Sequence, residues 1–566
     1  MDSQSNWELI ETWTSSCSPT SKDHHTCFRD IRVASSGVPS RLIDLEAGDT
    51  GQELHLSLSP DERPPLPYIT LSYTWGPNPQ QHLLTLLRKD SLQTFARQIP
   101  FSNLPRLFQD AIHSTRRLKF RYLWIDALCI IQGDDDDWRR ESAVMGEIYR
   151  GAALNIAAGG AVNSHSQLFS SRDASRVQPC RVELNWTEMS VGLGRGRSDI
   201  RGSYVVVSNA FLEDSLLQIP LNRRGWVMQE RTLSVRLLHF GKDQLFWRCM
   251  NHNACETFPN GIPNAFDKTY GIDLEKFEYG KDSGSVDSWF YIVETYSMCQ
   301  LTYESDRLVA LSGLAKMYDM KARGANNAYL AGLWQSKLAS FLLWRLLDGK
   351  QSDGTSSKRC PAHGLPNYVA PSWSWASVLG KVAFRYSKNS IVNKFSQLFD
   401  LIEARIAPVD MGNPYGQVLE GSISIRATLV PGRKFHWSRS RIHEYDQQSD
   451  RNYNTFVAST KPLGRNAVIC VMDDRSSLKP RTMSPLSIIG VFKAPDIDFC
   501  PLVARQDKGS HALQVADNIP DIEGILVTRI DGKDNVYQRV GYFCSSLHSK
   551  DVSFFLDQKR SDIVLV

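Results

Sequence analysis

The chain has 566 residues, of which 42% are hydrophobic and 22% are charged, and its formal net charge is +4. These proportions are typical of a globular protein, and the length is enough for two or three packed units. The small net charge, with no block of Lys and Arg interleaved with aromatic residues, argues against nucleic-acid binding.

The sequence shows no signal for secretion or for a membrane span. The N-terminal residues MDSQSNWELIETW have neither a basic region nor an apolar core, so we expect no signal peptide. The run closest to a membrane span, 339–347, is interrupted by Arg345 and is too short to cross a bilayer. The 11 cysteines have no framework spacing, which indicates reduced thiols. We therefore expect a cytoplasmic protein.

Residues 1–65 form an N-terminal segment that we expect to pack on the core, and they contain a candidate metal cluster. Cys17, His25 and Cys27 offer the thiolate and imidazole ligands that suit zinc, with His24 as a competing imidazole. The fourth ligand would come from a second group of candidates, Cys249, His252 and Cys255. The alternative is a set of buried thiols beside a solvated pair of histidines, and the irregular spacing favours this alternative.

The main unit begins with two buried strands and a helix between them. Residues 68–72 (YITLS) predict the first strand and 122–125 (YLWI) the second. Between them, apolar residues at helical spacing predict a helix that begins near Ser102 or Asn103 and ends near Leu118. The strand–helix–strand order indicates an α/β fold with a parallel sheet and a right-handed crossover.

Residues at the carboxyl ends of both strands are candidates for a binding site, because open α/β sheets bind ligands at that edge. Ser72, Tyr73 and Trp75 end or follow the first strand, and Asp126 follows the second. The alternatives are that Trp75 covers the core and that Asp126 is a turn or cap residue.

A one-sided helix follows the second strand. The carboxylates of Asp134 to Asp137 favour a helix N-terminus, and the helix is predicted from Trp138 to about Arg150. Its apolar side carries Trp138, Val144, Met145, Ile148 and Tyr149. Glu141 lies near the middle of that side, where a carboxylate is costly unless it is paired, hydrogen-bonded or faces a cleft.

Shorter elements follow this helix. We expect surface loops with one or two strands at 159–208, a helix or tight turn at 222–230, and a hairpin of 236–240 with 244–249. Helical spacing then dominates 289–347, with breaks at Gly313 and around Gly324.

The last part of the chain is rich in short strands separated by Gly, Pro and Asp turns, which predicts a C-terminal antiparallel β-domain. The expected strands are 422–429, 467–472, 486–492, 524–529, 537–543 and 563–566. The predicted division of the chain is therefore an N-terminal segment (1–65), the α/β core (66–232), a hairpin with a mainly helical extension (233–394) and the β-domain (395–566).

Four stretches of the chain occur in an order that is typical of one known domain. They are YITLSYTWG (68–76), LPRLFQDAI (104–112), RYLWIDALCIIQGDDDDWRRESAVMGEIYRGAALNIAA (121–158) and RRGWVMQER (223–231). Together they resemble the heterokaryon incompatibility (HET) domain of filamentous fungi. The flanking stretches LHFGKDQLFWRC, DRLVALSGLA, APSWSWASV and EGILVTRI are similar to those of the longer proteins of that family, so the resemblance covers most of the chain.

The resemblance implies a role in nonself recognition, where incompatible partners trigger programmed cell death. The HET core also resembles the TIR fold, a flavodoxin-like parallel sheet, and some TIR domains cleave NAD with a Glu on the helix after a central strand. On this resemblance Glu141 occupies the catalytic position of a NAD hydrolase. Ser72, Tyr73 and Trp75 would line the nucleotide, and Asp126 would hold a ribose hydroxyl. The implied partners are a second copy, through self-association of the HET core, and an unidentified incompatibility protein.

The alternative is a non-catalytic signalling module of the same fold, in which Glu141 is a structural carboxylate bonded to Arg121 or to a backbone amide. Another alternative, an enzyme with Cys129 as nucleophile, is disfavoured because its apolar ALCII setting and the lack of a nearby His indicate an inert thiol. A dehydrogenase or an NTPase is disfavoured because no G-x-G-x-x-G follows a strand and no P-loop is present.

Overall fold

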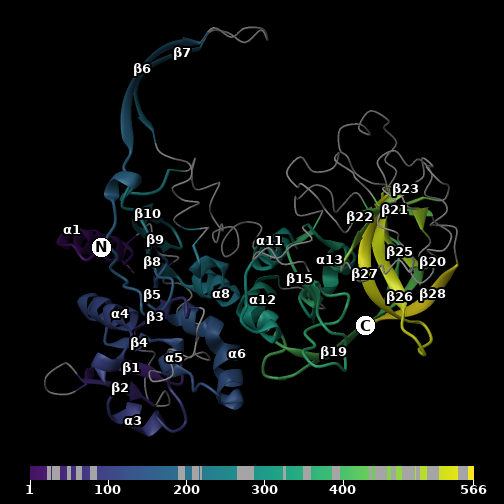
Figure 1. Cartoon of the computed structure of the whole chain (residues 1–566), viewed down its shortest axis with the longest axis horizontal. Coiled ribbons are helices and arrows are strands. Elements are labelled where there is room, and N and C mark those ends of the chain that lie inside the picture. Colours follow the sequence, from purple (N-terminus) through teal and green to yellow (C-terminus); the bar gives the residue numbers. More distant parts are fainter. Residues whose placement is uncertain are drawn as a thin grey trace. The chain divides into compact units, whose positions relative to one another are not determined.

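A computed structural model gives the fold of the chain (Figure 1). It describes residues 1–18, 20–21, 24, 27, 39–47, 53–58, 67–76, 86–188, 198–206, 216, 219–263, 286–322, 327–347, 358–384, 395–431, 436–439, 455–459, 467–473, 491–492, 498–505, 522–545 and 559–566. The chain forms two compact units, Met1–Tyr279 and Gly280–Val566. None of the described helices combines the length and the apolar character needed to cross a bilayer.

Unit 1 is built on an eight-stranded sheet with the order β10-β9-β8-β5-β3-β4-β1-β2. Its strands are β1 Leu42–Ala47, β2 Glu53–Ser57, β3 Tyr68–Ser72, β4 Tyr122–Trp124, β5 Leu154–Ala157, β8 Arg236–Phe240, β9 Leu245–Cys249 and β10 Asn253–Cys255. The four central strands β4, β3, β5 and β8 run parallel, and the outer strands pair antiparallel. The predicted parallel pairing of the first two core strands is confirmed, but the sheet as a whole is mixed.

The residues of β3 explain its central place. All five side chains of YITLS are buried, as expected of a strand covered on both faces. Ile69 pairs with Leu123 of β4 on one side and with Leu154 of β5 on the other. Helices cover the two faces: α4 lies on one side of these strands, and α6 with α8 on the other (Figure 1).

The helices of unit 1 follow the apolar spacing of the sequence. They are α1 Gln4–Ser16, α3 Leu92–Arg97, α4 Arg106–Arg117, α5 Asp126–Cys129, α6 Asp135–Gly151 and α8 Gly225–Leu233, with 3-10 turns η4 Phe101–Asn103, η5 Ala174–Arg176 and η7 Leu221–Arg223. The predicted cap at Ser102 or Asn103 is wrong, because the helix that follows begins at Arg106, with Pro105 as its N-cap residue and no side-chain cap. Helix α6 begins three residues before the predicted Trp138, because the side chain of Asp134 accepts hydrogen bonds from the backbone N–H groups of Asp136 and Asp137.

Two further predicted elements are also present in unit 1. The hairpin of β8 and β9 is confirmed, with His239 opposite Phe246, and it joins the main sheet through β5. Within 159–208, strands β6 Cys180–Glu188 and β7 Ser198–Val206 pair with each other as a separate two-stranded sheet.

Unit 2 begins with helices, as its sequence predicts. They are α11 Val286–Tyr296, α12 Val309–Ala322 and α13 Leu338–Leu342, with 3-10 turns η8 Glu304–Arg307, η9 Gln335–Lys337 and η10 Trp375–Ser377. The predicted break at Gly313 is wrong, because α12 continues through that residue. Small antiparallel pairs follow: β11 Tyr329–Leu330 with β12 Leu333–Trp334, β13 Trp344–Leu346 with β16 Val382–Phe384, and β14 Lys358–Arg359 with β15 Val378–Leu379.

The second half of unit 2 is a twelve-stranded sheet. Its strands are β17 Phe395–Gln397, β18 Asp400–Pro408, β19 Val418–Thr428, β20 Val430–Pro431, β21 His436–Arg439, β22 Thr455–Ser459, β23 Ala467–Met472, β24 Val491–Phe492, β25 Asp498–Arg505, β26 Ile522–Arg529, β27 Val536–Ser545 and β28 Arg560–Leu565. The predicted antiparallel arrangement holds for every pair of described strands except β27 with β28, which is parallel. Residues 486–490 of one predicted strand lie outside the described part of the chain.

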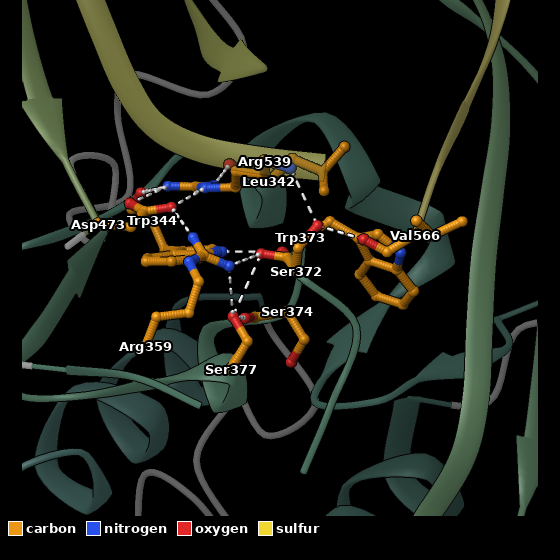
Figure 2. Close-up of polar contacts among 10 residues, drawn as sticks. All are labelled: Leu342, Trp344, Arg359, Ser372, Trp373, Ser374, Ser377, Asp473, Arg539 and Val566. Atoms are coloured by element: carbon orange, nitrogen blue, oxygen red, sulfur yellow. Dashed lines mark hydrogen bonds and ion pairs between the residues drawn. The ribbon is translucent and has the colours of Figure 1, made fainter. Parts of the chain in front are cut away.

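A buried polar network joins this sheet to the helical half of unit 2 (Figure 2). The guanidinium of Arg539 on β27 donates to Asp473 across 3.0 Å and to the backbone carbonyls of Leu342 and Trp344. It also lies 3.5 Å from the ring centre of Trp344. Asp473 accepts a second ion pair, of 2.6 Å, from Arg359. The fully buried Arg539 therefore has partners from both halves of the unit.

Candidate functional site

The four residues predicted to bind substrate meet at the carboxyl edge of the parallel strands. Ser72 is the last residue of β3, Tyr73 and Trp75 lie in the following loop, and Asp126 is the first residue of α5. Trp75 Nε1 donates to Asp126 Oδ2 across 3.1 Å, and the rings of Tyr73 and Trp75 stack with their centroids 6.3 Å apart. Asp126 Oδ1 also accepts a hydrogen bond of 2.7 Å from the N–H of Ala127, but Asp126 is not the cap residue of α5, because the N-cap position is Ile125.

Ser72 lies at the point where the strand order of the sheet reverses. After β3 the chain goes to β4 on one side and then to β5 on the other, so the topological switch point, at which open α/β sheets bind ligands, lies between β3 and β5. Asn155 of β5 faces Ser72 there, and its Nδ2 donates to Ser72 Oγ across 3.0 Å. Ser72 Oγ in turn donates to Glu230 Oε2 of α8 across 2.5 Å.

Burial dominates the electrostatics of this cluster. It raises the pKa of Glu230 to about 7, although the charge of Arg224 and the hydrogen bond from Ser72 both favour the carboxylate. Burial also raises the pKa of Tyr149, on α6, well above its ordinary value. Arg224 donates to the backbone carbonyl of Tyr73, which places a cation beside the loop after β3. The cluster therefore holds a carboxyl group that titrates near neutral pH.

Glu141, the predicted catalytic residue, lies on the inner side of α6 as the helical wheel indicates. Its side chain is 1% exposed, and burial raises the pKa of its carboxyl group. Its Oε1 lies 3.6 Å from a guanidinium nitrogen of Arg41, and the side chain of Ser40 and the charge of Arg41 both lower the pKa of the carboxyl group against the effect of burial. Its Oε2 is buried and has no hydrogen-bond partner within 3.5 Å among the described residues. Among the described residues, no hydrogen bond or ion pair joins Glu141 directly to Ser72, Tyr73 or Asp126.

Arg41 connects Glu141 to the start of its own helix. The guanidinium pairs with Asp137 at 2.5 Å and donates to the carbonyl of Cys129 across 2.6 Å. Asp137 also accepts a hydrogen bond of 2.8 Å from the N–H of Ile131. The cationic partner of Glu141 is therefore Arg41 and not the expected Arg121, which pairs with Asp44 at 2.7 Å.

Sequence reasoning missed two of these residues, Glu230 and Arg41. For Glu230 a usable signal exists, because Val227 and Leu233 flank it at helical spacing in α8 and both are buried. The inward position of Glu141 was inferred from the same kind of pattern. For Arg41 no local signal exists, because its partners lie 88 and 96 residues away.

Cys129 has the inert character expected from its apolar surroundings. Its side chain is fully buried, and burial raises the pKa of its thiol to about 12. A thiol that stays protonated at neutral pH is a poor nucleophile, so the structure gives no support to catalysis by Cys129.

A second cluster, of thiols and imidazole, lies beside β9. Cys17, His24, Cys27 and Cys249 present four ligand atoms that all lie within 4.8 Å of one another. The predicted ligand His25 lies outside the described residues, and the imidazole in the cluster is the competing one, His24. Hydrogen bonds from the thiols of Cys249 and Cys27, together with the charge of Arg236, hold the pKa of Cys17 well below its usual range.

Comparison with known proteins gives one match. Residues 68–230, from β3 to α8, match the family described as heterokaryon incompatibility protein (HET). No curated protein and no solved structure matches the chain. The matched region includes the Ser72, Asn155 and Glu230 cluster as well as Glu141.

Proposed function

From the match of residues 68–230 to the HET family we propose that the chain acts in nonself recognition, where contact with an incompatible partner leads to programmed cell death. We place the effector function in the α/β core, because the matched region holds buried carboxyl groups near the carboxyl edge of its parallel strands. The proposed partners are an unidentified incompatibility protein and a second copy of the core.

The order of the parallel strands supports a TIR-like core. Numbered along the chain, β3, β4, β5 and β8 are the first to fourth parallel strands, and they lie in the sheet in the order second, first, third, fourth. Flavodoxin-like sheets have this order and bind their nucleotide cofactor at the switch between the first and third strands. In this chain that switch lies between β3 and β5.

The reaction that we propose is hydrolysis of NAD to nicotinamide and ADP-ribose. The bond between the ribose C1′ and the pyridinium nitrogen breaks, and nicotinamide leaves as a neutral molecule with the bonding electron pair. Water then adds to C1′ and releases a proton to solvent. The ribose acquires oxocarbenium character on the way, and a carboxylate held close to it stabilises that charge.

One observation carries this assignment: the buried Oε2 of Glu141 has no hydrogen-bond partner among the described residues. A buried carboxylate oxygen without a partner is costly, and a ribose hydroxyl or the developing positive charge would supply one. The neighbouring Arg41 favours the ionised form of Glu141, which the reaction requires, against the effect of burial. In this proposal Ser72, Tyr73 and Trp75 line the nucleotide, Trp75 by stacking, and Asp126 holds a ribose hydroxyl.

The test is to incubate the purified full chain with NAD, at concentrations that promote self-association, and to measure released nicotinamide. We expect release by the wild type and a loss of at least about 100-fold in Glu141→Gln, the size typical of removing one charge-stabilising group. Asp136→Asn is the matched control, because it removes an exposed carboxylate from the same helix. Glu230→Gln tests the competing carboxyl group: a loss in this variant alone would move the catalytic role from Glu141 to Glu230.

A second candidate function is a signalling module without catalysis. The observation that favours it is the ion pair of Glu141 with Arg41, which gives the carboxylate a structural partner. In that case the wild type releases no nicotinamide under any of these conditions, and Glu141→Gln changes stability without changing any activity. Nicotinamide release that Glu141→Gln removes and Asp136→Asn leaves intact would exclude this candidate.

A further inference from the structure

The cluster of Cys17, His24, Cys27 and Cys249 brings four metal-binding side chains together from separate parts of unit 1. Cys17 is the C-cap residue of α1, and Cys249 ends β9 more than two hundred residues later. The three cysteine side chains are buried, whereas His24 is partly exposed. Four such side chains would not be expected to converge through packing alone, because a thiol forms only weak hydrogen bonds.

The distances within the cluster fit a tetrahedral metal site. His24 Nδ1 lies 3.3 Å from Cys249 Sγ and 3.9 Å from Cys27 Sγ. In a tetrahedral zinc site with bonds of about 2.0–2.3 Å, neighbouring ligand atoms are about 3.3–3.8 Å apart. All four ligand atoms of the cluster lie within 4.8 Å of one another, so a small adjustment of side chains closes the tetrahedron.

The geometry points to a structural zinc ion bound by Cys17, His24, Cys27 and Cys249. Three thiolates and one imidazole form a recurrent structural zinc set, and four protein ligands leave no open position for a substrate or water. Soft thiolate ligands also disfavour magnesium and calcium, which prefer oxygen. The site is independent of the proposed NAD hydrolysis.

A buried cation beside the cluster can offset the negative charge of such a zinc site. Three thiolates with Zn²⁺ carry a net charge of about −1, which a buried cation can offset. Arg236 on β8 is buried and donates from Nε to Cys17 Sγ across 3.2 Å. The same side chain donates to the carbonyl of Ala153 across 3.2 Å, so it is held in position from the sheet side. Arg236 therefore has the role of a positioning residue for the ligand Cys17.

The first experiment is metal analysis of the full chain, purified under reducing conditions without added metal. We expect one zinc ion per chain, and its release when the thiols are blocked with a mercurial reagent. The absorption spectrum of the chain after exchange of the metal for Co²⁺ gives a second readout, and it needs no variant. We expect thiolate-to-cobalt charge-transfer bands and the strong visible bands of tetrahedral cobalt. A zinc chelator should also lower the melting temperature, because zinc bound only by the folded chain stabilises it.

Variants then identify the ligands. Cys249→Ala and His24→Ala should reduce the zinc content to a small fraction of one per chain, whereas His24→Cys, which restores a ligand, should retain the zinc. Cys255→Ala is the matched control, since Cys255 is a buried cysteine of the same sheet outside the cluster, and its zinc content should equal that of the wild type. A folded wild-type chain that contains no zinc and gives no cobalt spectrum would overturn the assignment. Stoichiometric iron in place of zinc would overturn it too.

Discussion

The hydroxyl of Ser72 donates a hydrogen bond of 2.5 Å to Oε2 of Glu230, a carboxyl group 158 residues further along the chain. The contact joins the end of β3 to α8, and Glu230 is 4% exposed. The two residues lie near opposite ends of the region that matches the HET family. Folding therefore changes the protonation of Glu230, because it buries the carboxyl group, although the hydrogen bond from Ser72 favours the carboxylate.

The pH dependence of stability should report the burial of this carboxyl group. The pKa of Glu230 rises from its ordinary value of 4.5 to about 7 in the folded protein. Between these pH values the folded chain keeps a proton that the unfolded chain has lost, so the free energy of unfolding falls as the pH rises. The fall is at most about 1.4 kcal/mol per pH unit, or about 3 kcal/mol over the whole window.

Urea unfolding at pH 5 and pH 8 measures this effect when the wild type is compared with Glu230→Gln. The variant cannot titrate at this position, so its stability should fall less than that of the wild type between the two pH values. Equal falls in the two proteins would show that Glu230 does not titrate in this window.

Replacement of Arg41 by Met should destabilise unit 1 by about 3–5 kcal/mol. The change removes the buried cation and leaves the carboxylates of Asp137 and Glu141 without it. Arg140→Met is the control, because Arg140 also pairs with Asp137 but its side chain is 66% exposed, and we expect it to cost less than about 1 kcal/mol. Chemical denaturation of both variants measures the difference; similar costs would mean that burial does not govern these ion pairs.

The start of α6 should depend on the side chain of Asp134. Asp134→Ala removes the acceptor for the N–H groups of Asp136 and Asp137 and should cost about 1 kcal/mol. Asp134→Asn keeps an oxygen at this position and should recover most of that loss. Thermal unfolding distinguishes the two variants. If Asn is as destabilising as Ala, the negative charge of Asp134 matters more than its role as a hydrogen-bond acceptor.

Arg539→Met should destabilise unit 2 by about 3–5 kcal/mol, since it leaves the buried Asp473 with one cation in place of two. It also removes the donors to the carbonyls of Leu342 and Trp344 (Figure 2). Arg426→Met provides the comparison, because Arg426 forms an exposed ion pair of 2.7 Å with Asp562 in the same unit. We expect the loss of this exposed pair to change the stability much less than the loss of Arg539, and denaturation followed by fluorescence measures the stability of both variants.

The core elements of unit 1 could be predicted because their signals are local. The apolar run of β3, the capping carboxylate of Asp134 and the helical spacing in α4 and α6 each lie within one short segment. The inward position of Glu141 was also correct, since it depends only on the helical wheel. The predicted start of α6 at Trp138 is three residues too late, because the capping residue is Asp134 and the helix begins at Asp135.

The partners of these side chains could not be predicted, because they come from distant segments. Arg41 reaches Glu141 only because β1 pairs with β4, with Ile43 opposite Leu123. Glu230 reaches Ser72 only because α8 lies against β3. The imidazole of the cysteine cluster could not be chosen from sequence either, because His24 and His25 are adjacent and spacing does not distinguish them.

The pairing of β1 with β4 also shows that the region matched by the family is smaller than the unit that folds. A fragment limited to residues 68–230 would lack β1 and β2, so β4 would become an unprotected edge open to pairing with another chain. It would also lack β8, the fourth parallel strand, so β5 would be exposed in the same way. Arg41, Cys17 and Cys249 would be lost with these segments. Such a fragment should aggregate, whereas one that spans residues 1–263 keeps both flanks of the sheet.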